Sequence, residues 1–103
     1  MSSEPTVVHN PEQTRFELIL DGEQVGLVDY RPAGASVIVA HTEIDPGHEG
    51  EGLGALLVQA SLEGIRDMGK TVIPTCPFTA AYIKRHPEWA EHVAPAMRAQ
   101  FQR

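Results

Sequence analysis

The sequence predicts an α/β fold of the mixed α+β type, with an antiparallel meander at the N-terminus followed by a central helix. Three features support this prediction: hairpin turn signals between β-like segments, a glycine-spaced loop, and an amphipathic segment directly after that loop. The 103 residues fit one compact domain. Residues 1–6 and about 95–103 are expected to be loose termini.

The N-terminal half alternates β-like segments with turn signals. Asp21-Gly22 is a strong signal for a two-residue hairpin, and Pro32-Ala33-Gly34 marks the next turn. β-branched residues are frequent in the segment after that turn, as is typical of strands. The expected strands are Val7 to His9, Arg15 to Leu20, Gln24 to Arg31 and Ala35 to Ile44.

The segment from Gly52 to Met68 has the periodicity of an amphipathic helix. Its expected apolar stripe is Leu53, Leu56, Leu57, Ala60, Gly64 and Met68, and its expected wet face is Gln59, Glu63, Arg66 and Asp67. Gly69 is placed to end this helix in the left-handed conformation.

The remaining segments are a strand and two helical stretches. Lys70 to Cys76 is expected as a strand, although Pro74 within it cannot donate a ladder hydrogen bond. Thr79 to Arg85 is expected as a short helix that Pro87 ends or kinks, and residues 88–103 are expected to be helical with a fraying tail.

The glycine-spaced loop indicates a phosphate-binding function. Gly50, Gly52 and Gly54 allow sharp turns and close approach of a ligand, and the next helix aims its free N–H groups at the loop. A Rossmann unit would need a buried parallel strand before the loop and an acidic residue on the next strand, whereas the segment around Lys70 to Thr75 has none. A P-loop would need Gly-Lys-Ser/Thr where the chain reads Ala55-Leu56-Leu57.

The loop resembles the acyl-CoA-binding loop of the Gcn5-related N-acetyltransferases, Arg/Gln-x-x-Gly-x-Gly/Ala, with Gly52 and Gly54 in its second half and Glu49 in place of Arg or Gln. A narrower resemblance, to small single-domain acetyltransferase-like proteins of the YjdJ type, covers nearly the whole chain. The blocks that carry it are His41-Thr42-Glu43, the glycine loop, Thr75-Cys76-Pro77-Phe78, Ala81-Tyr82-Ile83 and Arg85-His86-Pro87-Glu88.

The resemblance implies a minimal acyl-CoA N-acyltransferase fold whose two central parallel strands splay apart to admit acetyl-CoA. Backbone near Glu43 to Asp45 would polarise the thioester carbonyl, and the glycine loop would hold the pyrophosphate. The implied cofactor-binding residues are Ile44, Asp45, Gly50, Gly52, Leu53, Gly54, Ala55, Cys76, Tyr82 and Arg85. Arg85 would hold a phosphate, and Tyr82 would line the pantetheine channel or simply pack.

Three residues are candidates for catalysis. Cys76 is expected beside the thioester as a nucleophile, as part of the pocket lining, or as a small buried packing residue. His41 and Glu43 are two residues apart on one strand and therefore share a face. Either could accept the proton of the amine, although His41 could equally be a structural histidine.

The expected reaction is acetyl transfer from acetyl-CoA to an amine, which could be a small amine, a peptide or a protein. The alternative is a CoA-binding module with no turnover, or with only stoichiometric acetylation of Cys76. No room exists between Val8 and Arg15 for the two helices that build the acceptor site in larger relatives, so the acceptor groove is expected to be open.

Composition narrows the partners. A net charge of −6 argues against nucleic-acid binding, and the sequence has neither a membrane-spanning apolar run nor a signal peptide. A single cysteine suits the cytoplasm, where thiols stay reduced. Histidine and cysteine spacing predicts no metal site. We expect a cytoplasmic protein that is a monomer or a weak homodimer.

Overall fold

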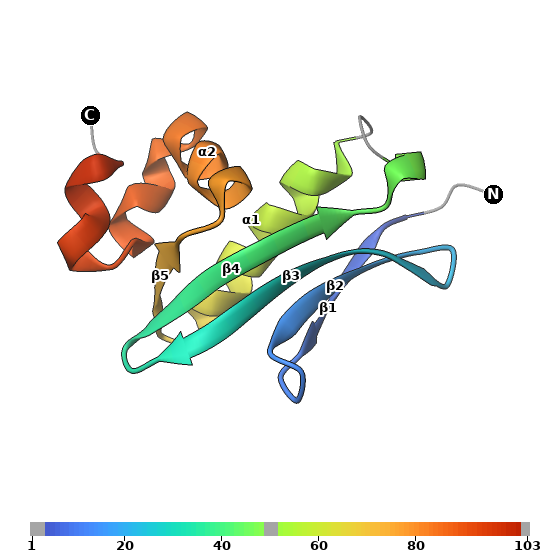
Figure 1. The fold of residues 1–103 in the computed structure, drawn as a ribbon, viewed down its shortest axis with the longest axis horizontal. Helices are drawn as coiled ribbons and strands as arrows, with labels where there is room; N and C mark the ends of the chain where they lie inside the picture. The colour runs from blue at the N-terminus through green and yellow to red at the C-terminus, as the bar shows by residue number, and fades with distance from the viewer. Residues whose placement is uncertain (1–3, 49–51, 102–103) are drawn as a thin grey trace.

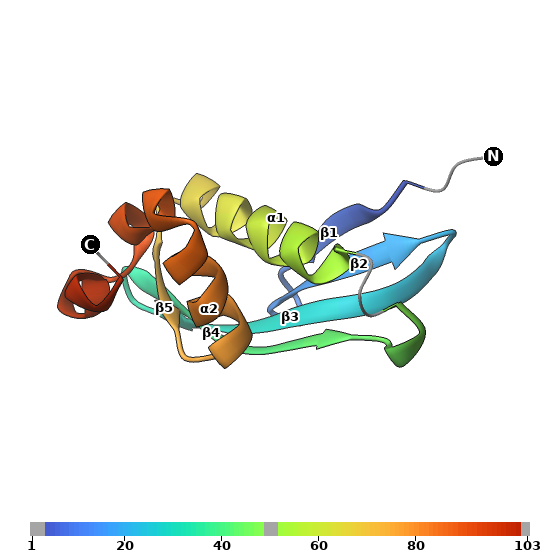
Figure 2. The same cartoon turned by 90° about the horizontal axis from the view of Figure 1, so that it is seen from above.

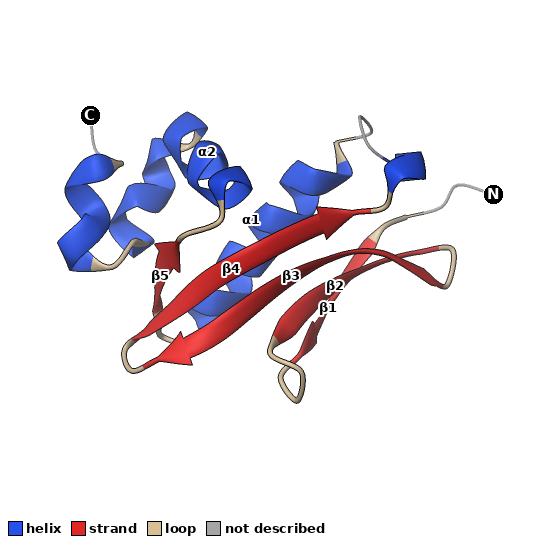
Figure 3. Ribbon diagram, viewed as in Figure 1, coloured by secondary structure: helices blue, strands red, loops and turns tan. Residues whose placement is uncertain are grey.

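The computed structural model of the chain describes residues 4–48 and 52–101. Within them the chain forms a five-stranded sheet in the order β1-β2-β3-β4-β5 (Figures 1 and 3). The strands are β1 (Thr6–Asn10), β2 (Arg15–Leu20), β3 (Glu23–Ala33), β4 (Ser36–Ile44) and β5 (Thr71–Pro74). The helices are α1 (Leu53–Asp67) and α2 (Pro77–Arg85), with 3-10 segments η1 (Pro46–His48), η2 (Pro87–His92) and η3 (Pro95–Gln100).

The first four strands form the antiparallel meander that the turn signals predict. Asp21 and Gly22 both have positive φ, 54° and 79°, which is the conformation of a type I′ turn. The bounds of β2 match the predicted segment, and β3 extends beyond its predicted segment at both ends. The predicted meander is therefore confirmed, and the parallel pairing of β4 with β5 makes the sheet mixed, as also predicted.

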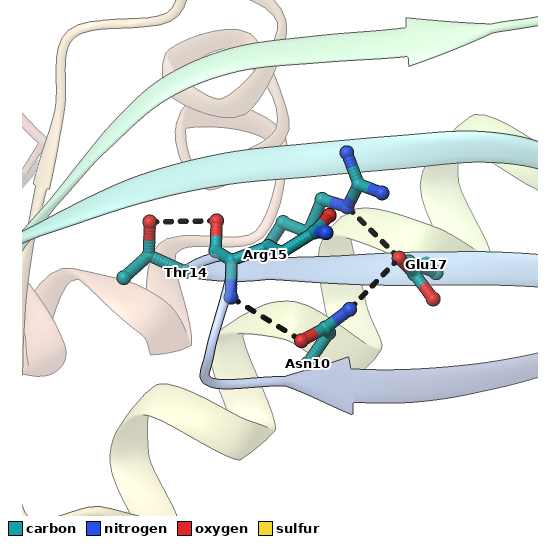
Figure 4. Close-up of polar contacts among 5 residues, drawn as sticks. Asn10, Thr14, Arg15 and Glu17 are labelled. Atoms are coloured by element: carbon teal, nitrogen blue, oxygen red, sulfur yellow. Dashed lines mark hydrogen bonds and ion pairs between the residues drawn. The ribbon is translucent and has the colours of Figure 1, made fainter.

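The connection between β1 and β2 is held by polar side chains (Figure 4). The Gln13 N–H donates to Asn10 Oδ1 at 3.2 Å, and Asn10 Nδ2 donates to Glu17 Oε2 at 3.3 Å. The same carboxylate oxygen accepts from Arg15 Nε at 2.8 Å.

Helix α1 carries the chain from β4 to the parallel strand β5, and α1 and α2 lie on the same face of the sheet (Figure 2). Gly64 lets α1 approach the sheet closely, since a Cβ there would stand 2.6 Å from Phe16 Cε1. Gly69 follows the helix with a φ of 75°, as its predicted capping role requires.

The buried face of α1 differs from the predicted stripe. Leu56 and Met68 are 39% and 38% exposed. The buried residues are Leu53, Leu57, Val58, Ser61, Leu62 and Ile65. The predicted stripe was wrong by a rotation about the helix axis, because the sheet and α2 both pack against α1 and bury a flank that the stripe did not include.

The C-terminal stretch also differs from its prediction. Instead of an α-helix, the chain forms η2 and η3, each with a proline in its first turn. Between them Ala94 N–H donates to Val72 O at 2.8 Å, which draws the chain against β5 in an extended conformation. Phe101 is buried, so the predicted loose tail in fact contributes to the core up to this residue.

Candidate active site

The parallel pairing of β4 with β5 ends at Val39 and Pro74. Cys76 N–H still donates to Val39 O at 3.1 Å, and β4 then runs on to Ile44 without a described strand beside it on that edge. The predicted splay of the central strands is confirmed in this sense. Pro74 is the last paired residue of β5. Its missing N–H therefore does not interrupt the hydrogen-bond ladder, which ends there.

A β-bulge at Ala40 decides which side chains of β4 enter the site. Asp29 pairs with His41 while Tyr30 pairs with Val39, so Ala40 is the extra residue. Val39 faces the helices before the bulge, and the alternation then places Thr42 on that face, opposite buried Val28. His41 therefore points to the opposite, helix-free face of the sheet.

His41 and Glu43 share that helix-free face. Their side chains are 55% and 62% exposed, and His41 Nε2 lies 3.5 Å from Glu43 Oε1. The predicted pairing of His41 with Glu43 on one face is thus present, but the strand itself separates both from the face on which Cys76 contacts Thr42. A ligand group that lies in the splay between β4 and β5 would therefore be open to both faces of the sheet, the one with the helices and the helix-free one.

A cavity of about 370 Å³ occupies the opening of the splay on the helix side. Its lining comes from the unpaired end of β4, from η1, and from the first turns of α1 and α2. The lining residues are Thr42, Ile44, His48, Gly52, Gly54, Ala55 and Phe78. Four of the predicted cofactor-binding residues are among them: Ile44, Gly52, Gly54 and Ala55.

The first turn of α1 presents backbone N–H groups to this cavity. Gly52 is the N-cap with a φ of 77°, a conformation that a side chain would strain, and no side chain in the described part of the chain caps the helix. The first hydrogen bond recorded for this turn is from Leu56 N–H to Gly52 O at 3.2 Å. Near an α-helix N-terminus the first N–H groups have no intrahelical acceptor, so those of Leu53, Gly54 and Ala55 suit an anion, with the helix dipole behind them.

Cys76 lies at the other N-terminus, as the N-cap of α2. Its side chain is 7% exposed, and Sγ donates to Thr42 Oγ1 at 3.5 Å. Burial raises the pKa of the Cys76 thiol, but hydrogen bonds from Thr42 and from the backbone of Thr79 and Phe78 outweigh it, so the net pKa is below the usual value. The thiol is thus buried and in contact with Thr42, a residue that lines the cavity.

Two predicted cofactor-binding residues, Asp45 and Arg85, do not line the cavity, and a third cannot be placed. The backbone N–H of Asp45 donates to Val25 O at 2.8 Å, which removes it as a donor to a thioester carbonyl. Arg85 is exposed at the end of α2, about 10 Å along the axis from Phe78 at ~1.5 Å per residue. Gly50 lies outside the described residues.

Tyr82 packs between the helices instead of lining the cavity. It is buried, donates to Gln59 Oε1 at 3.0 Å and stacks on His86 with ring centroids 4.2 Å apart. Burial and the carboxylates of Glu88 and Glu63 raise the pKa of its phenol. Leu53 is likewise buried and reaches the site through its backbone only.

Four residues that sequence reasoning did not single out belong to the site: Thr42, His48, Phe78 and Thr79. Pro77 could have indicated two of them, because proline favours the first helical position and so moves the start of α2 ahead of Thr79. The role of Thr42 depends on the bulge at Ala40, for which we find no signal in the sequence.

The chain matches a family model described as GCN5-related N-acetyl-transferase over residues 15–93. This range contains β2 to β5, both α-helices, the cavity and Cys76. No curated protein matches the sequence. Among the described residues, no helix is long and apolar enough to cross a membrane, and no three His, Cys, Asp or Glu side chains are grouped to hold a metal ion.

Proposed function

Because the chain belongs to the GCN5-related N-acetyltransferase family, we propose that it transfers the acetyl group of acetyl-CoA to an amine. The observation that carries this proposal is the cavity, which runs from the uncapped N-terminus of α1 to the unpaired edge of β4. One end offers N–H donors for phosphate, and the other lies beside a polar wall suited to a thioester.

The lining residues fit the parts of the cofactor. Gly52, Gly54 and Ala55 bring backbone N–H groups to the pyrophosphate end, where a Cβ at Gly52 would strain the turn. Ile44 and Phe78 offer apolar contact to the pantetheine arm. The cofactor supplies the acetyl group in activated form, as a thioester.

The bare face of the sheet supports an acceptor approaching from the side opposite the cavity. His41 and Glu43 flank the unpaired edge of β4 on that face and are exposed enough to take the proton of an incoming amine. No described helix covers this face (Figure 2), which suits a bulky amine or a peptide.

We expect His41→Gln and Glu43→Gln, made separately, to leave acetyl-CoA affinity within about twofold. The substitution that removes the general base should lower the turnover number about 100-fold.

Calorimetric titration with acetyl-CoA and CoA tests the cofactor site. We expect micromolar binding, about −8 kcal/mol, which Gly52→Trp abolishes by straining and filling the first turn of α1. Gly34→Trp is the matched control, because Gly34 also has a positive φ and open space around it but lies in the β3–β4 turn, away from the cavity. Absence of binding by the folded wild-type protein would refute the proposal.

The second candidate is a CoA-binding module that does not turn over, or that is only acetylated once on Cys76. The exposure of both His41 and Glu43 favours it, since neither is held in a closed site. Intact mass spectrometry after incubation with acetyl-CoA separates the candidates. A single acetyl adduct that Cys76→Ala removes, without transfer to any amine of a screened set, would support the second candidate.

A further inference from the structure

Thr79 carries a buried hydroxyl for which the fold offers no conventional partner. The residue is 1% exposed, and within the described part of the chain its Oγ1 has no hydrogen-bond partner. Thr79 is the third residue of α2, the position whose side chain in a capping box accepts the N–H of the N-cap residue. Here that N–H belongs to Cys76 and already donates to Val39 O at 3.1 Å.

The candidate acceptor for the Thr79 hydroxyl is the sulfur of Cys76. Sulfur lies over the first turn of α2, where the N–H groups of Phe78 and Thr79 also point, and Thr42 Oγ1 lies 3.5 Å away on the other side. Both hydroxyls can act as donors to an anionic sulfur. An orphaned buried hydroxyl is costly, and a thiolate would give it an acceptor.

The position of this sulfur relative to the cavity indicates its reaction partner. Thr42 both contacts Sγ and lines the cavity, so a ligand that fills the cavity toward β4 ends next to the thiol. In the proposed function, which this inference assumes, the end of that ligand is the sulfur of CoA. The sulfur of CoA would then lie beside Thr42, whose Oγ1 is 3.5 Å from Cys76 Sγ.

We propose that Cys76 is a covalent modification site at which the protein forms a mixed disulfide with CoA, and that Thr42 and Thr79 are positioning residues that hold its sulfur as a thiolate. In the exchange, the Cys76 thiolate attacks one sulfur of CoA disulfide, a new sulfur–sulfur bond forms, and the old one breaks. One CoA leaves as a thiolate, which takes the bonding electron pair and a proton from water. The retained CoA fills the acetyl-CoA cavity and closes the site until a thiol reduces the bond.

Incubation with CoA disulfide, followed by intact mass spectrometry, tests the modification. We expect one added CoA, removed by dithiothreitol and absent from Cys76→Ser. The disulfide of pantetheine, which lacks the nucleotide, should react at least about tenfold more slowly if the cavity holds the phosphates. Failure of the wild-type protein to form the adduct would overturn the proposal.

The matched variants Thr79→Val and Thr79→Ser test the role of the hydroxyl. Valine keeps the shape and removes the donor, so the thiolate is less populated but more nucleophilic. The exchange should therefore be about threefold slower at neutral pH and about threefold faster at high pH, where both thiols are ionised. Thr79→Ser should follow the wild-type profile. Altered packing alone would slow the reaction equally at every pH, and that result, or a wild-type profile for valine, would refute the positioning role.

The outcomes keep this inference apart from the proposed function. Equal reaction with both disulfides, together with no CoA binding by calorimetry, would refute the cofactor site and, with it, CoA as the specific partner. A crossing pH profile for Thr79→Val with the pantetheine disulfide would still establish the thiolate site. Thr42→Val, which removes the second hydroxyl from an isosteric position in β4, should give the same crossing if Thr79→Val does not fold.

Discussion

Two helix N-termini meet at the cavity, and they differ in what they offer. The first turn of α1 presents Gly52, Gly54 and Ala55 to the cavity, and no described side chain caps it. The first turn of α2 begins at Cys76, is stiffened by Pro77 and buries its thiol behind Thr42. The positive end of a helix dipole is present in both.

The difference shows how burial converts the same backbone feature into different chemistry. At α1 the first residues of the helix line the cavity, so their N–H groups suit a ligand that arrives already charged, such as phosphate. At α2 the N–H groups lie under a side chain of the protein itself, so they act on the ionisation of that side chain instead. The N-terminus of α1 is therefore suited to binding a phosphate, and the N-terminus of α2 to controlling the reactivity of the Cys76 thiol.

The largest expected effect comes from removing the phosphates from the ligand. This change tests the N-terminus of α1 separately from the N-terminus of α2. Acetyl-pantetheine keeps the thioester and the arm but has nothing for the first turn of α1 to bind. We expect its affinity to be at least about 100-fold below that of acetyl-CoA, as charge-assisted hydrogen bonds at a helix N-terminus are lost. Calorimetry on the wild-type protein measures this ratio, and similar affinities for both ligands would show that α1 contributes little.

An intermediate effect is expected for the ionisation of Cys76. Because the pKa of the folded thiol is lowered, alkylation by iodoacetamide should reach its half-maximal rate at a lower pH in the folded protein than in the denatured one. In terms of stability, this contribution is present above the pKa of the unfolded thiol and is lost as the pH falls through the folded value. Thr42→Val removes one stabilising hydrogen bond, so its alkylation midpoint should move to higher pH. Coinciding profiles for native and denatured protein would contradict this assignment.

The smallest expected effect concerns the contact that joins the two turns. A Cβ at Gly54 would stand 2.6 Å from Phe78 Cζ, so Gly54→Ala must displace a ring that is 43% exposed and able to move. We expect acetyl-CoA affinity to fall about threefold, a cost of well under the ~1.4 kcal/mol of a tenfold change. Phe78→Leu combined with Gly54→Ala should recover part of that loss, since a smaller side chain leaves room. An additive loss in the double variant would mean that the two positions act independently.

Local sequence determined the strands and both α-helices, although not the 3-10 segments that follow α2. Asp21-Gly22 specifies a turn in which both residues have positive φ, and the β-branched run before the glycine loop specifies β4. Gly52 and Gly69 at the two ends of α1 needed no tertiary information, because only the backbone conformation at each position is at stake. The same local signals were enough to expect phosphate binding at this loop.

Tertiary structure decided which side chains share a site. The bulge at Ala40 turns Thr42 toward Cys76 and His41 away from it, and one extra residue in a strand reverses every side chain beyond it. Because the sheet and α2 both pack against α1, the buried face of this helix does not include Leu56. Because Cys76 N–H donates to Val39 O, the Thr79 hydroxyl is left without a hydrogen-bond partner among the described residues. Periodicity in a sequence fixes how residues alternate, whereas the phase of that alternation depends on contacts with distant parts of the chain.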